Sequence, residues 1–230
     1  KGQQQNRLAQ HRTTGMAAYH AADFKKAVEE LAPYVREQRH DVAALFVMGR
    51  SLLQMAKPSS QTVDYAIILL RRVVALEPTH THAPYDLLHL FSERGYGTET
   101  IDLADELLER NAVDTRALRA KAIALSGMGR TDDALSVADH CANFNPADVA
   151  VQMLRLQLMQ RMGRPPIDLI VQAEMLREKH PDDSRFSLLM AVAHLLVNEY
   201  PKARYWARTA ALEPMTDNRL RSTLTQILDD

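Results

Sequence analysis

The sequence has few of the residues that mark special structural classes. Its 230 residues include one cysteine, eight glycines and 6% aromatic residues. A single thiol cannot form an internal disulfide, and so few glycines exclude collagen-like and low-complexity chains. The 28 basic and 29 acidic residues leave a formal net charge of -1, which gives no general attraction for nucleic acid. The composition is that of an ordinary globular chain.

No apolar run is long enough to cross a membrane. A spanning helix needs about 20 apolar residues in a row, whereas the apolar run at residues 66–70 ends at Arg71 and Arg72 and the run at 42–48 ends at Gly49 and Arg50. We therefore expect no direct membrane insertion by this segment. The sequence begins at Lys1 without an initiator methionine, which leaves open a removed signal or anchor. The compartment thus stays undecided between cytoplasm and periplasm.

Helix-favouring residues dominate, and β-branched runs are rare, so the sequence predicts an all-α fold. Glycine recurs at intervals of 34 residues, and proline keeps nearly the same period. The recurring residues are Gly15 and Gly49, then Gly95, Gly129 and Gly163, together with Pro78, Pro146, Pro181 and Pro214. Self-similarity at a fixed period of this length is typical of a repeat architecture.

These residues resemble the tetratricopeptide repeat, a helix–turn–helix unit of 34 residues. The fourth repeat matches best, with Ala122, Gly129, Ala134 and Pro146 at the family's positions. The resemblance covers nearly the whole chain and implies a right-handed α-solenoid of about six repeats in one domain, 1–230. The repeats are expected at 8–41, 42–80, 81–114, 115–148, 149–183 and 184–216, before a capping helix at 217–230.

The recurring residues also have physical roles that do not depend on the resemblance. Gly15 and Gly49 are expected where the two helices of a repeat cross closely. The left-handed residue after a first helix favours Gly or Asn, which predicts this conformation at Gly95, Gly129, Gly163 and Asn198. Aspartates are expected to cap the following helices, at Asp41, Asp114, Asp148 and Asp183. An enlarged turn is predicted at 57–61.

The resemblance implies that the first helices line a concave groove that binds a peptide. Set positions of those helices give the candidate groove residues, which are Arg12, Met16, Tyr19, Phe46, Arg50, Leu53, Tyr85, His89, Arg116, Arg119 and Ile123. For Met16 and Phe46, the alternative to ligand contact is packing against an adjacent helix. For each arginine, the alternative is a solvent-exposed side chain with no ligand.

Charge is sorted by helix in the predicted repeats. Acidic residues favour second helices, at Glu99, Asp102, Asp105, Glu106, Glu109, Asp132 and Asp133. The candidate groove residues include arginines and aromatics but no acid. This pattern predicts a basic trough that binds an acidic, partly apolar peptide. The chain lacks the carboxylate clamp of chaperone-binding relatives, since Met16 and Phe46 stand at two of its positions.

Residues with catalytic or metal-binding chemistry are sparse. His82, Asp86 and His89 share a helical face, but their spacing fits a polar patch better than a metal site. Cys141 occupies a small-residue position between helices, which predicts a buried, inert thiol. The sequence has no phosphate-binding loop and no zinc or hydrolase motif. We therefore predict no catalysis, no cofactor and no metal.

The resulting hypothesis is a non-catalytic adaptor that binds a protein or peptide partner. One alternative is a structural scaffold that assembles with copies of itself. Another is the recognition module of a larger membrane-anchored or secretion-related protein. Fold alone does not choose between them.

Overall fold

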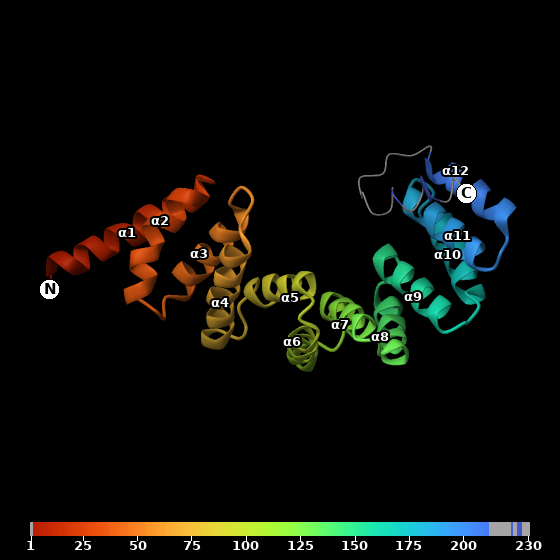
Figure 1. The fold of residues 1–230 in the computed structure, drawn as a ribbon, viewed down its shortest axis with the longest axis horizontal. Helices are drawn as coiled ribbons and strands as arrows, with labels where there is room; N and C mark the ends of the chain where they lie inside the picture. Colours follow the sequence, from red (N-terminus) through yellow and green to blue (C-terminus); the bar gives the residue numbers. More distant parts are fainter. Residues whose placement is uncertain (1, 212–221, 223–224, 227–230) are drawn as a thin grey trace. The chain divides into compact units, whose positions relative to one another are not determined.

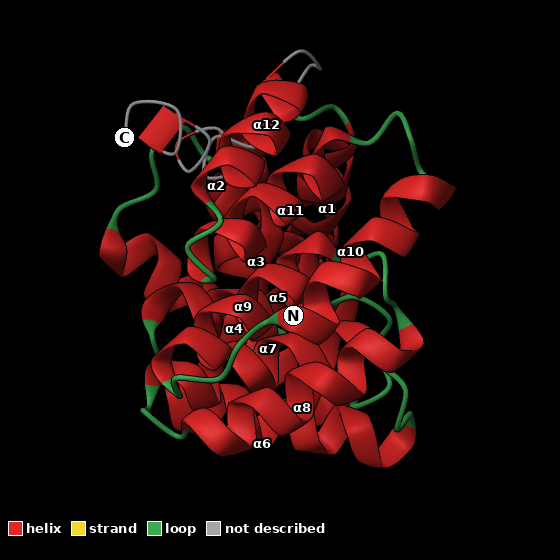
Figure 2. Cartoon of the chain, turned by 90° about the vertical axis from the view of Figure 1, so that its right-hand side faces the viewer, coloured by secondary structure: helices red, strands yellow, loops and turns green. Residues whose placement is uncertain are grey.

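The computed structural model describes residues 2–211 together with 222, 225 and 226. Within these residues the regular elements are α-helices, and no strand occurs (Figure 2). The predicted all-α fold is confirmed. Pro214 lies outside the described residues, as does most of the expected capping helix over 217–230.

Contacts divide the chain into two compact units, residues 1–94 and 95–230. The first unit holds α1 (Gly2–His20), α2 (Phe24–Glu37), α3 (Val42–Gln54), α4 (Ser60–Leu76) and α5 (Ala83–Arg94). The second holds α6 (Gly97–Arg110), α7 (Thr115–Gly127), α8 (Thr131–Phe144), α9 (Val149–Arg161), α10 (Ile167–Lys179), α11 (Ser184–Leu196) and α12 (Tyr200–Ala211) (Figure 1). A single domain over 1–230 stays a prediction.

Each predicted repeat contains one helix pair. We call the odd-numbered helices leading helices and the even-numbered ones second helices. Within the units, α1 packs on α2, α3 on α4, α7 on α8 and α11 on α12. Leading helices also contact each other, α1 with α3, and α9 with both α7 and α11. An enlarged turn is present, but at residues 55–59 instead of the predicted 57–61. Helix α3 ends at Gln54, and Ser60 and Gln61 already belong to α4.

The four predicted aspartate caps are confirmed. The side chain of Asp41 accepts a hydrogen bond from the Ala44 backbone N–H, and Asp148 accepts from Ala150 and Val151. Asp114 and Asp183 cap α7 and α11 in the same way. These bonds satisfy N–H groups that have no partner within their own helix.

The predicted left-handed residues are also confirmed. Gly95, Gly129, Gly163 and Asn198 have φ between +61° and +76°. Two further left-handed residues were not predicted. Lys57 has φ +56° between α3 and α4, and Ala22 has φ +59° between α1 and α2. The next residue, Asp23, donates its backbone N–H to Ala18 O, and Arg130 after Gly129 bonds Leu125 O in the same pattern. Ala22 therefore adopts the turn that glycine serves in later repeats.

Close helix crossing explains the glycine of the first repeat. A Cβ added at Gly15 would lie 2.6 Å from Leu31 Cγ, so α1 and α2 could not keep this separation with any other residue. The buried cores between the packed helices consist mainly of small and branched apolar residues. In the second unit, Leu118, Leu125, Ala138 and Leu158 belong to one buried cluster across α7, α8 and α9.

Candidate protein-binding surfaces

The predicted groove residues of the first unit lie on its leading helices, and none is buried. Arg12, Met16 and Tyr19 lie on α1, Phe46, Arg50 and Leu53 on α3, and Tyr85 and His89 on α5. His89 is exposed and pairs with Glu93 at 3.4 Å, and the others are partly exposed. Partial exposure leaves side-chain surface for a ligand at each position.

Arg12 is held by an acidic cap. Its Nε donates to Asp41 Oδ2 at 2.7 Å, and the Tyr34 hydroxyl donates to the same oxygen at 2.8 Å. Burial acts to raise the pKa of Asp41, but hydrogen bonds from Arg12, Ala44 and Tyr34 outweigh it, so the pKa lies below its ordinary value. The Arg12 side chain remains 41% exposed.

Phe46 and Arg50 form a second cluster. The Arg50 guanidinium lies 5.6 Å from the Phe46 ring centre, and its Nε lies 3.3 Å from Asp86 Oδ2. The His80 ring packs on Phe46 with centres 4.4 Å apart. Burial raises the pKa of Asp86, although Arg50 and nearby histidines oppose the shift. Phe46 is partly exposed and contacts these polar neighbours.

His82, Asp86 and His89 show no metal-site arrangement. Across the described part of the chain, no group of three His, Cys, Asp or Glu residues is placed to hold a metal ion. His80 has a structural role instead, since its Nδ1 accepts the backbone N–H groups of His82 and Ala83. These bonds support the start of α5.

In the second unit, the predicted residues Arg116, Arg119 and Ile123 lie on α7. Arg119 donates to Asp148 Oδ2 at 3.0 Å, while Oδ1 of the same aspartate caps α9. Arg116 is more exposed and lies 3.8 Å from its own helix cap, Asp114. Ile123 is 46% exposed. The predicted basic surface therefore carries aspartates beside its arginines, which lowers its net positive charge.

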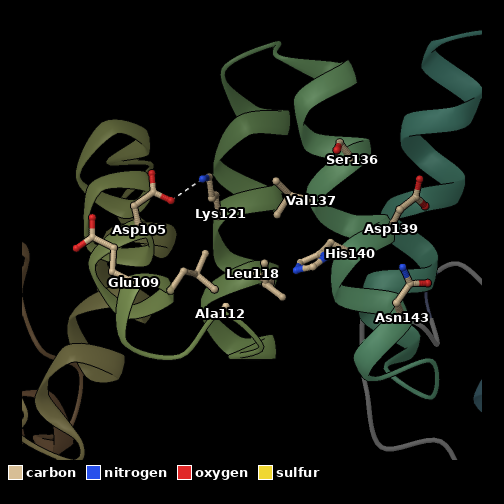
Figure 3. A pocket seen from close by; sticks show the side chains of 11 residues that line it. Asp105, Glu109, Ala112, Leu118, Lys121, Ser136, Val137, Asp139, His140 and Asn143 are labelled. Carbon is tan, nitrogen blue, oxygen red and sulfur yellow. Dashed lines mark hydrogen bonds and ion pairs between the residues drawn. The ribbon is translucent and has the colours of Figure 1, made fainter.

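Sequence reasoning missed a pocket on the second-helix side of this unit. The pocket has a volume of about 800 Å³ and lies between α6 and α8, with α7 behind it (Figure 3). Its lining residues are Asp105, Leu108 and Glu109 of α6, Ala112 of the turn before α7, Leu118 and Lys121 of α7, and Ser136, Val137, Asp139, His140 and Asn143 of α8.

Two ion pairs recur at the 34-residue period beside this pocket. Lys121 of α7 bonds Asp105 Oδ1 on the preceding second helix. Arg155 of α9 bonds Asp139 Oδ1 at 2.7 Å, again on the preceding second helix. Both acids and both bases are separated by 34 residues, and this spacing was the sequence signal that could have revealed the pairs.

The predicted burial of Cys141 is confirmed. Its thiol donates to Thr115 O at 3.4 Å, and burial raises its pKa to about 11. A thiol that stays protonated is a poor nucleophile. No helix among the described residues is long and apolar enough to span a membrane.

These features define a tetratricopeptide-like helical-repeat fold. No family model and no curated protein matches the chain. Among solved structures, a crystal structure of MamA protein has a TM-score of 0.59 at 15% identity, covering 91% of this chain and 97% of that chain. MamA 41-end from Desulfovibrio magneticus RS-1 has a TM-score of 0.60 at 16% identity, covering 77% and 98%. MamA AMB-1 has a TM-score of 0.61 at 20% identity, covering 76% and 93%. At these identities the likeness shows the fold.

Proposed function

We propose that the chain is a non-catalytic adaptor that holds a peptide segment of a partner protein on its leading helices. The observation that carries this proposal is the anchoring of half-exposed arginines by helix-cap aspartates. Arg12 and Arg119 each make one charged hydrogen bond through their guanidinium, and each remains 41% exposed. The cap holds the side chain in place before a ligand arrives.

Anchored arginines can still bind a peptide. A guanidinium has five N–H donors, and the Nε of Arg12 donates to Asp41. The remaining donors can pair with a peptide carbonyl or carboxylate. Holding the side chain in advance lowers the entropy lost on binding. Partly exposed Tyr19 and Phe46 provide aromatic surface for apolar ligand residues.

The paired aspartates change the expected mode of recognition. Because Asp41 and Asp148 neutralise their arginines, long-range attraction of an acidic peptide is weaker than a bare row of arginines would give. We propose that a partly apolar peptide with spaced carboxylates binds through directional hydrogen bonds. Its affinity should therefore depend only modestly on salt.

Fluorescence anisotropy with a labelled aspartate–leucine peptide tests this proposal. Arg116→Gln with Arg119→Gln should weaken binding at least about tenfold, since each charged hydrogen bond is worth about 1.5–3 kcal/mol. Arg130→Gln with Arg164→Gln is the matched control, because these exposed arginines lie outside the leading helices. Equal affinity of the double variant and the native chain, with unchanged circular dichroism, would refute the leading-helix surface.

Self-assembly is a second candidate, favoured by one exposed row on α10. Ile167, Val171 and Met175 recur every four residues and are 60%, 52% and 54% exposed. A row of this kind on one helical face suits a contact between copies. Light scattering over a concentration series would show concentration-dependent assembly, and Val171→Glu should abolish it. A native chain that stays monomeric throughout excludes this candidate.

A further inference from the structure

The pocket between α6 and α8 combines an apolar floor with an acidic rim. Leu108, Leu118 and Val137 supply the apolar surface, and the acidic lining residues are Asp105, Glu109 and Asp139. In Figure 3 the Asp105 carboxylate points toward Lys121, while the carboxylates of Glu109 and Asp139 point outward at the two edges. Lys121 is the only lysine or arginine among the lining residues. Arg116 and Arg119 of α7 are not among the lining residues.

The carboxylates of the rim retain free acceptor sites. Asp105 and Asp139 are 47% and 45% exposed, and each uses its Oδ1 in an internal ion pair. Glu109 is exposed and has no ion pair among the residues that the structure describes. Glu106 and Asp102 on the same helix are also exposed and add negative charge nearby. A carboxylate accepts several hydrogen bonds, so these groups can take donors from a ligand.

The neighbouring gap shows how this fold holds an arginine between second helices. Arg155 is 13% exposed and bonds Asp139 on α8 and Gln172 on α10, both at 2.7 Å. Its side chain thereby bridges the two second helices. Lys121 occupies the equivalent place one repeat earlier, but within the described residues it bonds Asp105 on α6 and does not reach α8. The space that an arginine closes in one gap is open in the other.

We propose that this pocket is a second binding site, which takes an arginine-bearing, partly apolar peptide segment of a partner protein. An apolar side chain of that segment packs on Leu108, Leu118 and Val137. Its arginines bond Glu109 and the open oxygens of Asp105 and Asp139, as Arg155 does with Asp139 in the next gap. Charge complementarity selects a basic ligand, opposite in sign to the ligand proposed for the leading helices.

Anisotropy with a labelled arginine–leucine peptide tests this site on the full chain. The native protein should bind this peptide. A second labelled peptide, in which glutamate replaces each arginine, should bind at least about tenfold more weakly. Glu109→Arg should weaken binding about tenfold, whereas Glu106→Arg, with the same charge change on the same helix outside the pocket, should leave most of the affinity. Equal losses in the two variants would mean general attraction to an acidic helix and would overturn the proposal.

A steric variant provides an independent readout. Ser136 is exposed on the pocket wall, so Ser136→Trp should fill the opening without disturbing the core. Gln157→Trp places the same side chain at an exposed position outside the pocket and serves as its control. Undiminished peptide binding by Ser136→Trp would disprove the site. Arg116→Gln with Arg119→Gln should leave this binding intact, so its outcome is separate from that of the leading-helix proposal.

Discussion

Asp41 joins two helices that belong to successive repeats. Its Oδ1 accepts the Ala44 N–H at the start of α3, and its Oδ2 accepts the Nε of Arg12 from α1. Arg119 and Asp148 repeat this arrangement in the second unit, with the same separation of 29 residues. One aspartate thus accepts a hydrogen bond from a free N–H group at the start of one helix. It also holds an arginine of the preceding leading helix in place.

The joint at Asp41 should make stability depend on pH. The pKa of Asp41 in the folded chain lies below its ordinary value of 3.8, so its contribution is present above that value and is lost as pH falls through the folded pKa. Asp41→Asn keeps a capping side chain but loses the charge pair. It should cost about 1 kcal/mol at pH 7. Urea unfolding between pH 7 and pH 3 should show this cost constant at neutral pH and shrinking only below about pH 3.8.

Asp86→Asn serves as a control, because the pKa shift of Asp86 has the opposite direction to that of Asp41. Burial raises the pKa of Asp86, so ionisation of this carboxyl costs stability as pH rises through the folded value. The native chain should therefore gain stability relative to Asp86→Asn on acidification. Parallel pH profiles for the two variants would contradict the assigned roles.

Ala22→Gly should stabilise the first unit. An alanine in the left-handed region costs about 1–2 kcal/mol, and glycine removes most of this strain. Because Ala22 has φ +59°, we expect a gain of about 1 kcal/mol in the free energy of unfolding. Ala17→Gly within α1 is the contrast, since the same replacement at an exposed helical position should lose about 1 kcal/mol. A loss in both variants would rule out strain at Ala22.

Arg155→Ala should destabilise the second unit more than Lys121→Ala. Arg155 bonds Asp139, Gln152 and Gln172, and its removal leaves all three without that partner. We expect a cost of about 2 kcal/mol, against at most about 1 kcal/mol for Lys121, which bonds one aspartate. Thermal or urea unfolding of both variants measures the difference. Equal costs would show that the bridge between second helices adds nothing to stability.

Cys141 should resist alkylation in the folded chain. Its pKa of about 11 leaves little thiolate at pH 8, and its burial blocks access. Iodoacetamide labelling followed by mass spectrometry should give slow modification that becomes fast in denaturant. Rapid labelling of the native chain would contradict the buried, protonated thiol.

The local features of the fold could be predicted from the sequence because they depend on single residues. Glycine and asparagine adopt the left-handed conformation with the least strain, so Gly129 could be predicted to end its helix. Short polar side chains cap helices, so Asp148 could be predicted as a cap. Ala22 was missed since its conformation is imposed by the helices on either side. The groove residues are on the predicted helices, but whether a peptide binds them stays a prediction.

The pairing of leading-helix arginines with cap aspartates and the pocket could not be predicted because both depend on distances between helices. Nothing in a single helix shows that Asp148 reaches Arg119, so the predicted surface looked more basic than it is. The pocket depends on the separation of α6 and α8, which packing on α7 decides. The acidic bias of second helices was visible in the sequence at Asp105 and Glu109, but the hollow between them and α8 was not.

The 34-residue recurrence of Lys121 and Arg155, each with its acid on the helix before, bears on how such a chain can lengthen. Duplicating one whole period copies a base and its acid together. The added segment would then arrive with its charges already matched to its neighbours. Lengthening the chain by whole periods therefore leaves no unpaired charged side chain at the new junction. An insertion of any other length would separate a base from its acid.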